Sequence, residues 1–166
     1  MITKKMQTAL NKQINEELFS SYLYLSMAAD FEARNLTGAA KWMKMQADEE
    51  LEHAMKFFHF VLERGGEVDL LAIAKPQKSW KSPLTAFQDA EKHEQHITKC
   101  INDLYEMATK EKDYATQSML KWFVDEQVEE EASVGEIVAR LEMIADSKNG
   151  LFMMDRDMAT RVFTPP

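Results

Sequence analysis

The sequence predicts an all-α fold, a four-helix bundle with one long crossover connection and a short fifth helix at the C-terminus. Three observations predict it. Residues that interrupt helices are scarce, with 5 Gly and 4 Pro among 166 residues. Apolar residues recur at helical spacing in four long segments. Two of the connections between these segments are short and one is long, which is typical of two antiparallel hairpins joined by a crossover.

The first hairpin is predicted from a helix over residues 4–34 and a second helix that stops at the glycines of 64–66. The first helix has one apolar face, made of Leu10, Ile14, Tyr24, Ala28 and Phe31. Residues 35–38 break its pattern, and Thr37 is predicted to cap the N-terminus of the second helix. The second helix directs inward the residues Ala39, Met43, Phe57, Phe60 and Val61.

The second hairpin follows residues 67–81, a stretch without helical periodicity that is longer than a typical connection between helices. Ser82 is predicted to cap the third helix, with Pro83 in its first turn. The apolar face of this helix holds Phe87, Ala90, Ile97, Ile101, Leu104 and Ala108. A short turn at 110–113 leads to the fourth helix, with Asp113 as its predicted cap. The apolar face of the fourth helix holds Met119, Phe123, Val134, Ile137 and Leu141.

The fourth helix is predicted to end at Asn149 and Gly150, because both residues favour helix termini. A brief fifth helix then follows. Its apolar side is made of Leu151, Met154, Met158 and Val162.

Composition narrows the class of protein. We expect one domain over residues 1–166, no membrane-spanning segment and no signal peptide, because no run of about 18 apolar residues occurs and the N-terminus enters helix-like sequence at once. A single cysteine, Cys100, predicts a reducing, cytoplasmic compartment. The formal charge of −8 argues against nucleic-acid binding. It suits a protein that attracts cations, and it suits ordinary solubility equally well.

Acids interrupt all four apolar faces near the middle of the helices. An ionised carboxylate in a helical core is costly unless it is paired or bound to a metal. At any one position, a side chain that reaches to solvent is the ordinary explanation, but that explanation must hold on four helices at once. Four carboxylates would balance two divalent ions, and carboxylates with one imidazole suit iron, manganese or zinc. Among these metals, iron best fits redox chemistry with oxygen at such a pair. The interrupting residues are Glu17, Glu50 with His53, Glu94, and Gln127 with Glu130.

Four segments carry a resemblance to a known family: residues 15–24, 49–53, 93–95 and 126–131. Over essentially its whole length the chain resembles the non-haem ferritins of bacteria and archaea. The resemblance implies a ferritin-like bundle with a di-iron centre.

The resemblance also implies a role for each interrupting acid. Glu17, Glu50 and His53 would hold the first iron, and Glu50 would bridge to a second iron held by Glu94 and Glu130.

Further residues match the family around that centre. Gln127 matches the neutral residue beside the second iron, and Tyr24 matches a tyrosine that forms a hydrogen bond or donates an electron. A third iron site is implied at Glu49, Glu126 and Glu129, with Glu130 shared. For these outer acids the alternative is a solvated run of glutamates on a helix.

Two departures separate the chain from related di-iron proteins. The general pattern has Glu-x-x-His on two helices, whereas the second copy here reads Gln127-x-x-Glu130. This favours a ferritin over a bacterioferritin or a rubrerythrin-like protein. Leu51 stands where bacterioferritins place the haem-binding methionine, so no haem is expected. Other residues are expected to pack or to lie at the surface: His59, His93, His96, Cys100 and Trp122.

The function implied is iron storage and detoxification. A ferroxidase centre would oxidise Fe²⁺ with dioxygen or hydrogen peroxide, and a homo-oligomeric cage of 24 subunits would store the ferric mineral. The fifth helix would then pack around the four-fold axes of that cage. Two alternatives are a di-iron peroxidase that stores no mineral and a metal-free helical interaction module.

Overall fold

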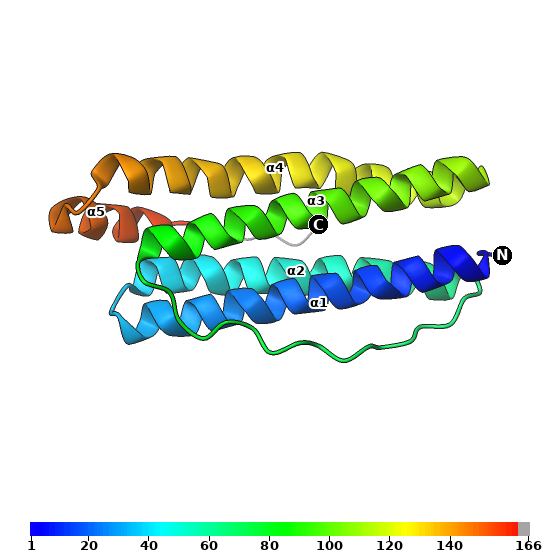
Figure 1. Cartoon of the computed structure of the whole chain (residues 1–166), viewed down its shortest axis with the longest axis horizontal. Coiled ribbons are helices and arrows are strands. Elements are labelled where there is room, and N and C mark those ends of the chain that lie inside the picture. Colours follow the sequence, from blue (N-terminus) through cyan, green and yellow to red (C-terminus); the bar gives the residue numbers. More distant parts are fainter. Residues whose placement is uncertain (163–166) are drawn as a thin grey trace.

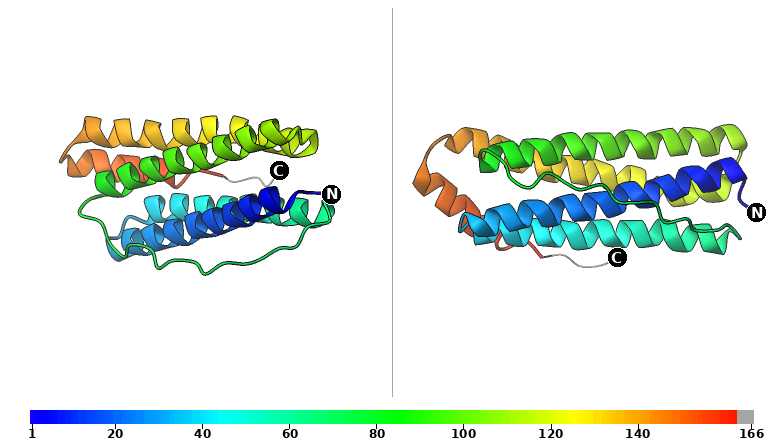
Figure 2. Two further views of the ribbon diagram at one scale, coloured as in Figure 1. Left: turned by 45° about the vertical axis from the view of Figure 1, so that its right-hand side comes forward. Right: turned by 60° about the horizontal axis from the view of Figure 1, so that its bottom comes forward.

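The computed structural model describes residues 1–162, and that part of the chain forms a helical bundle. Its helices are α1 (Lys4–Ala33), α2 (Thr37–Glu63), α3 (Pro83–Glu111), α4 (Tyr114–Ile144) and α5 (Lys148–Met158). α1 and α2 form one hairpin, α3 and α4 form the other, and an extended segment runs along the outside between them (Figures 1 and 2). The predicted bundle with one long crossover is therefore confirmed. In the described range, no helix is long and apolar enough to cross a membrane.

The crossover, residues 64–82, is attached along the length of α1 by side chains of that helix. Asn11 donates a hydrogen bond to the Glu67 carbonyl (2.9 Å) and accepts one from the Asp69 amide (3.2 Å). Further along α1, Ser26 donates to the Gln77 carbonyl. Near the end of the crossover, Trp80 is buried in the core. These contacts fix how the second hairpin is laid across the first.

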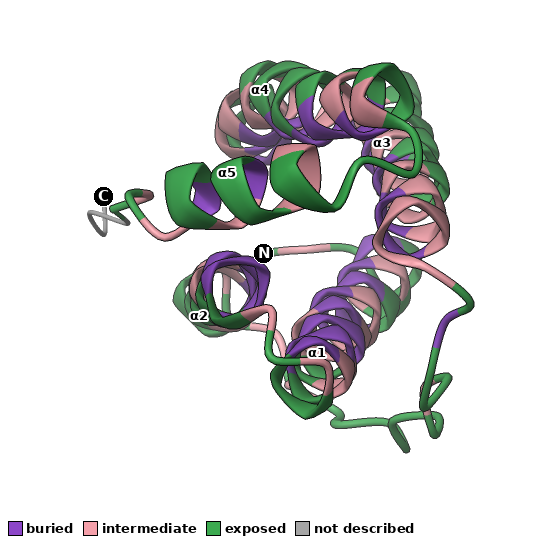
Figure 3. Cartoon of the chain, turned by 90° about the vertical axis from the view of Figure 1, so that its left-hand side faces the viewer, coloured by how far each residue is buried: buried purple, intermediate pink, exposed green. Residues whose placement is uncertain are grey.

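The apolar interior is divided into two clusters. One lies toward α5 and includes Phe31 stacked on Phe87, with ring centroids 5.7 Å apart. The other lies toward the N-terminus of α1 and includes Phe57 stacked on Phe123, at 4.1 Å. Figure 3 shows the buried parts of the helices turned toward the middle of the bundle. The predicted apolar faces are buried, except that Phe60 and Met119 are only partly covered.

Most predicted helix ends are confirmed. The Ser82 hydroxyl accepts a hydrogen bond from the Thr85 amide, and the Thr85 hydroxyl accepts one from the Ser82 amide, which completes a capping box before Pro83. Asp113 accepts from the Thr116 amide at the start of α4. Lys112, between α3 and α4, adopts the left-handed conformation that reverses the chain.

The predicted cap of α2 is wrong. Leu36 occupies the N-cap position, and Thr37 is already the first residue of the helix. The capping role passes to Asp155 of α5, whose carboxylate accepts from the amides of Gly38 (3.1 Å) and Ala39 (2.8 Å). Gly38 permits this docking, since a Cβ there would lie 1.7 Å from the Asp155 carbonyl oxygen. α5 is thereby attached to the first hairpin.

The predicted end of α4 is also wrong. α4 stops at Ile144, where Ala145 takes a positive φ of 44°. Ser147 caps α5 by accepting from the Gly150 amide (3.0 Å), so Asn149 and Gly150 lie in the first turn of α5.

The apolar side of α5 is shorter than predicted. Met154 and Met158 are buried and Leu151 is partly buried, but Val162 lies beyond the helix and is exposed. Gly150 is needed at the start of α5 because a Cβ would come within 2.9 Å of the Ile144 side chain.

Candidate metal centre in the middle of the bundle

A layer of polar side chains separates the two apolar clusters. Each of the four long helices supplies part of it, at the point where its residues pass from one cluster to the other. The layer contains six side chains, and none of these residues is more than 4% exposed. They are the residues that the sequence singled out: Glu17, Glu50, His53, Glu94, Gln127 and Glu130.

Within this layer the ligand atoms form two groups that share one residue. In the first group, one ligand atom each of Glu17, Glu50 and His53 lies within 4.8 Å of the others. In the second group, the same holds for Glu50, Glu94 and Glu130. Glu50 belongs to both groups, so its carboxylate stands where it can bridge two metal ions.

Buried amides position these carboxylates. Gln13 donates to Glu17 (2.9 Å), while Gln46 donates to both Glu50 (2.9 Å) and Glu130 (2.8 Å). Neither glutamine is among the residues predicted from the sequence. Each precedes an acid by four residues, which places it on the same helix face as that acid, and this spacing could have identified them.

Glu94 has two further partners. The Tyr24 hydroxyl donates to one of its oxygens, and the Gln127 amide donates to the other at 3.3 Å. One carboxylate oxygen of Glu17, Oε2, is buried and has no hydrogen-bond partner. A buried polar atom without a partner is rare because its desolvation is not compensated. A metal ion between Glu17, Glu50 and His53 would supply the missing partner.

Burial and mutual repulsion change the pKa values of these acids. Burial and the Glu50 charge raise the pKa of Glu17 and of Glu130 well above the usual value, and they raise that of Glu94 to about 8. The pKa of Tyr24 is likewise raised, by burial and by the Glu94 charge. Without a metal, the protein therefore keeps these acids largely protonated at neutral pH.

Glu50 and His53 behave differently because they form an ion pair, with 3.4 Å between His53 Nδ1 and Glu50 Oε2. Burial acts to lower the pKa of His53, but the hydrogen bond and charge of Glu50 outweigh it and raise the pKa to about 10. Burial acts to raise the pKa of Glu50, and the His53 contact reverses this effect. The His53 ring is further held edge-on against Trp122 (5.4 Å) and Phe123 (5.7 Å).

The outer acids predicted for a third iron lie at a rim of the centre, on α2 and α4. The structure does not bring Glu49, Glu126 and Glu129 into one group. Instead, half-buried Glu126 has ligand atoms within 4.8 Å of those of His53 and Glu130, while Glu129 is exposed.

Glu49 is already paired with a cation of the chain. Arg161, just beyond α5, forms a 2.7 Å ion pair with Glu49 and donates to Gln46 Oε1 at 2.8 Å. Its guanidinium also lies over the Trp42 ring, 4.2 Å from the centroid. Arg161 thus connects the C-terminal segment to the amide that holds Glu50 and Glu130. Helical periodicity carries no signal for this contact, which spans more than 110 residues.

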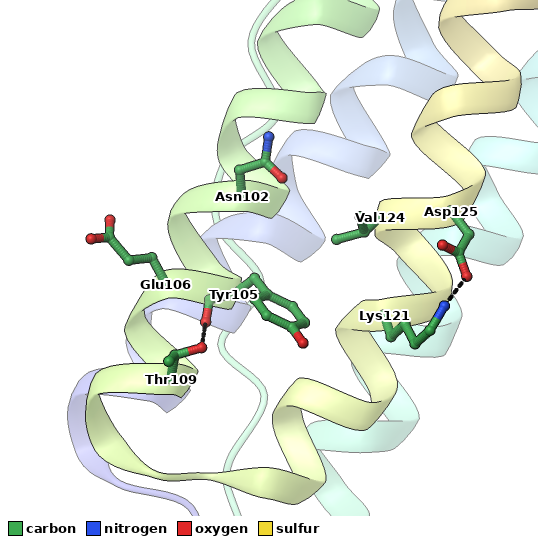
Figure 4. Close-up of a pocket in the computed structure, with 7 residues that line it drawn as sticks. All are labelled: Asn102, Tyr105, Glu106, Thr109, Lys121, Val124 and Asp125. Carbon is green, nitrogen blue, oxygen red and sulfur yellow. Dashed lines mark hydrogen bonds and ion pairs between the residues drawn. The ribbon is translucent and has the colours of Figure 1, made fainter.

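The remaining histidines lie apart from the two groups of buried ligands. His59 is exposed, and half-buried His93 shares a 2.7 Å hydrogen bond with Ser20. A surface groove of about 550 Å³ between α3 and α4 is also separate from the centre, because none of the six buried residues lines it (Figure 4). Its walls include Tyr105, Glu106, Lys121 and Asp125.

Known proteins with similar sequences and folds have descriptions that match this geometry. Residues 7–144 match the family model of the ferritin-like domain. A bacterial non-heme ferritin of Bacteroides fragilis is 40% identical over 161 residues, covering 97% of this chain and all of the relative. One from Staphylococcus aureus is 37% identical, covering 98% of each chain. Among solved structures, an open pore ferritin from the archaeon Archaeoglobus fulgidus has a TM-score of 0.97 and 50% identity, covering 98% of this chain and 100% of its own.

Proposed function

This chain belongs to the ferritin family, within it to the prokaryotic non-haem ferritins, and we propose on that premise that its buried polar layer is a di-iron ferroxidase centre. The protein is an iron-storing ferritin with ferroxidase activity. The observation that carries the assignment of the centre is the pair of buried three-residue groups that share Glu50. No lysine or arginine of the described residues forms an ion pair with these acids, and His53 is the one basic group that pairs with them, at Glu50. Ionisation of all four carboxylates therefore calls for external cations.

The ligands divide between the two ions. The first Fe²⁺ binds to Glu17, Glu50 and His53, where the unpartnered Glu17 oxygen supports the assignment. The second binds to Glu50, Glu94 and Glu130, with Gln127 as a neutral neighbour that donates to Glu94.

Metal binding displaces protons from this centre. His53 must be neutral to act as a ligand, and the buried acids must ionise. Because the pKa values of His53 and Glu94 are about 10 and about 8, protons compete with iron at neutral pH. The four carboxylates then carry −4, which two Fe²⁺ ions balance.

The carboxylates also favour oxidation. Hard anionic oxygens stabilise Fe³⁺ more than Fe²⁺, so the centre lowers the reduction potential of the iron pair. Each Fe²⁺ gives one electron, so the pair supplies the two electrons that reduce dioxygen to hydrogen peroxide or hydrogen peroxide to water. Tyr24 holds Glu94 in place through its hydroxyl. The side-chain amides of Gln13 and Gln46 hold the carboxylates of Glu17, Glu50 and Glu130 in position as the charge of the metal ions changes.

A third iron binds weakly at the rim, at Glu126 and Glu129 with Glu130 shared. Glu49 joins it only when Arg161 leaves, because a guanidinium and a metal ion cannot occupy the same carboxylate oxygen. Arg161 therefore limits the affinity of the third site.

Storage takes place in a homo-oligomeric cage of 24 subunits, with no bound haem, in the cytoplasm. Exposed large apolar residues on and after α5 support a subunit contact there, since such residues, where they form a patch, mark protein interfaces. They are Phe152, Met153 and Val162, each more than 60% exposed.

Anaerobic loading with Fe²⁺ followed by air tests this function. Absorbance reports oxidation, and the iron and mass of the recovered particle report storage. We expect oxidation well above the buffer rate and a retained ferric core. An oxidation rate equal to that of buffer contradicts the ferroxidase centre, and oxidation without retained iron favours a peroxidase that stores no mineral.

A further inference from the structure

A second group of metal-ligating side chains lies outside the buried centre, where α1 faces α3. It consists of Glu16 on α1 with His96 and Cys100 on α3, and one ligand atom of each lies within 4.8 Å of the others. His96 Nε2 lies 3.0 Å from Glu16 Oε2 and 3.6 Å from Cys100 Sγ. The same ring nitrogen therefore stands between a carboxylate and a thiol.

These separations suit a tetrahedral metal site. Zinc lies about 2.3 Å from sulfur and about 2.0 to 2.1 Å from nitrogen, which puts tetrahedral N and S ligands about 3.5 Å apart and N and O ligands about 3.4 Å apart. The observed 3.6 Å matches the first value, and the 3.0 Å contact needs a shift of a few tenths of an ångström. His96 and Cys100 are one helical turn apart on α3, so the backbone already places this ligand pair.

The ligand set points to a different metal from that of the centre. A thiolate and an imidazole favour borderline and soft divalent ions such as Zn²⁺, whereas carboxylates favour harder ions. The group is also reachable, since His96 is half exposed and a cavity of about 130 Å³ beside Glu16 and Cys100 opens to solvent. That opening leaves a fourth position for water.

We propose that Glu16, His96 and Cys100 bind one divalent cation of the Zn²⁺ class in an open, three-ligand site. This site goes beyond iron storage and is independent of the ferroxidase centre. A plain ion pair between His96 and Glu16 would explain those two residues but gives the thiol no role. Burial raises the pKa of the Cys100 thiol, and the charge of Glu16 adds to this effect, so the uncomplexed thiol stays protonated at neutral pH until a metal displaces the proton.

Cobalt(II) provides a test specific to this site. Cys100 is the only cysteine of the chain, so a thiolate-to-cobalt charge-transfer band in the near ultraviolet can arise only there, even if Co²⁺ also enters the buried acids. We expect the band to saturate at one Co²⁺ per subunit and to disappear when Zn²⁺ is added. Cys100→Ser should abolish the band, and His96→Gln should weaken Co²⁺ binding by at least tenfold.

Thiol reactivity gives a second readout that needs no cobalt. Zn²⁺ should slow the reaction of Cys100 with an aromatic disulfide reagent by at least tenfold in the wild type, but not in His96→Gln. His59→Gln is the matched control, because His59 is an exposed histidine on α2 outside the group. It should leave both readouts unchanged.

Three results would overturn the proposal: no charge-transfer band at saturating Co²⁺, a band of equal affinity in His96→Gln, or a thiol rate that Zn²⁺ does not change. Fast Fe²⁺ oxidation should persist in Cys100→Ser, so a failure here is distinguishable from a failure of the ferroxidase assignment. Circular dichroism of each variant confirms that it is folded.

Discussion

On α2 and α4, glutamates of the buried centre and of the acidic rim occupy neighbouring positions. The negative charge of the two regions is nevertheless compensated in different ways. Glu50 in the centre follows Glu49 of the rim, and Glu130 follows Glu129. Glu50 is 2% exposed and Glu130 is 4% exposed, and each lies among other acids. The rim is partly solvated, and Arg161 already neutralises Glu49.

The centre therefore needs metal ions to balance its ionised acids, whereas at the rim a metal ion competes with the Arg161 guanidinium for Glu49. Within the centre, His53 pairs with Glu50. The other three acids are neutralised by protons or by ions from outside, since burial raises their pKa values. At the rim, Arg161 neutralises Glu49, and water solvates the exposed carboxylate of Glu129. Loss of a ligand should therefore be severe in the centre and mild at the rim.

The largest expected effect is the loss of the shared ligand. Glu50→Ala removes the only carboxylate that belongs to both groups of the centre. We expect the initial rate of Fe²⁺ oxidation to fall by about 100-fold or more, or about 3 kcal/mol of transition-state stabilisation. Glu52→Ala is the matched control, because Glu52 is exposed on the same helix. An unchanged initial rate in Glu50→Ala would refute the bridging role.

The next effect concerns stability without metal. The folded-state pKa of Glu94 is about 8, above its ordinary value, so the folded protein binds more protons than the unfolded chain between these pH values. The stability that this proton contributes is complete below about pH 4.5 and is lost as pH rises through about 8. His53, with a folded pKa of about 10, acts in the same direction from about pH 6.5 upward. The metal-free protein should therefore melt at lower temperature at pH 8 than at pH 5.

Glu94→Gln tests this dependence, because it removes the titrating group and keeps its shape. At pH 8 the metal-free variant should be more stable than metal-free wild type, by on the order of a few kcal/mol, and the difference should shrink toward pH 5. Thermal melts in the presence of a chelator measure this difference. A lower midpoint than wild type at pH 8 would show that the buried charge is not destabilising.

A smaller effect is expected at the rim. Glu129→Ala leaves both groups of the centre intact, so the first oxidation of two Fe²⁺ per subunit should keep its rate. The iron-to-oxygen stoichiometry of later additions should change, because the third ion loses a ligand. Oxygen-electrode measurements at two and at three Fe²⁺ per subunit separate these phases. If the stoichiometry is the same as in wild type, the third iron does not bind at Glu129.

Helical periodicity predicts which acids lie in the centre, but it does not predict the contact of Arg161 at the rim. The helical period alone marks Glu17, Glu94 and Glu130 as acids within apolar faces, and the two hairpins bring them to one level. Periodicity carries no information on contacts between distant segments. Asp155 of α5 caps the start of α2, and Arg161, just after α5, pairs with Glu49. Both contacts form only when α5 docks on the bundle.

The surface group on α1 and α3 likewise depends on a contact between helices. His96 and Cys100 are four residues apart and could be paired from the sequence, but Glu16 joins them only through the crossing of two helices. Individually, each of the three has an ordinary explanation as a surface or packing residue. The geometry between helices, not the residue types, makes them a candidate site.

The smallest effect should come from substitution of Arg161, which would leave the rim, like most of the centre, without a cation of the chain. Arg161→Gln frees Glu49 and replaces no ligand of the centre, although it also removes the hydrogen bond that Gln46 accepts from Arg161. The ion pair is partly solvated, with side chains 21% and 16% exposed, so its contribution is about 1 kcal/mol. The affinity for the third Fe²⁺, measured by anaerobic calorimetry, should therefore rise by roughly three- to tenfold. Arg161→Lys keeps the cation and should restore most of the wild-type affinity. If Arg161→Gln binds the third Fe²⁺ no more tightly than wild type, then the guanidinium does not compete with metal at Glu49, and the two regions differ in solvation alone.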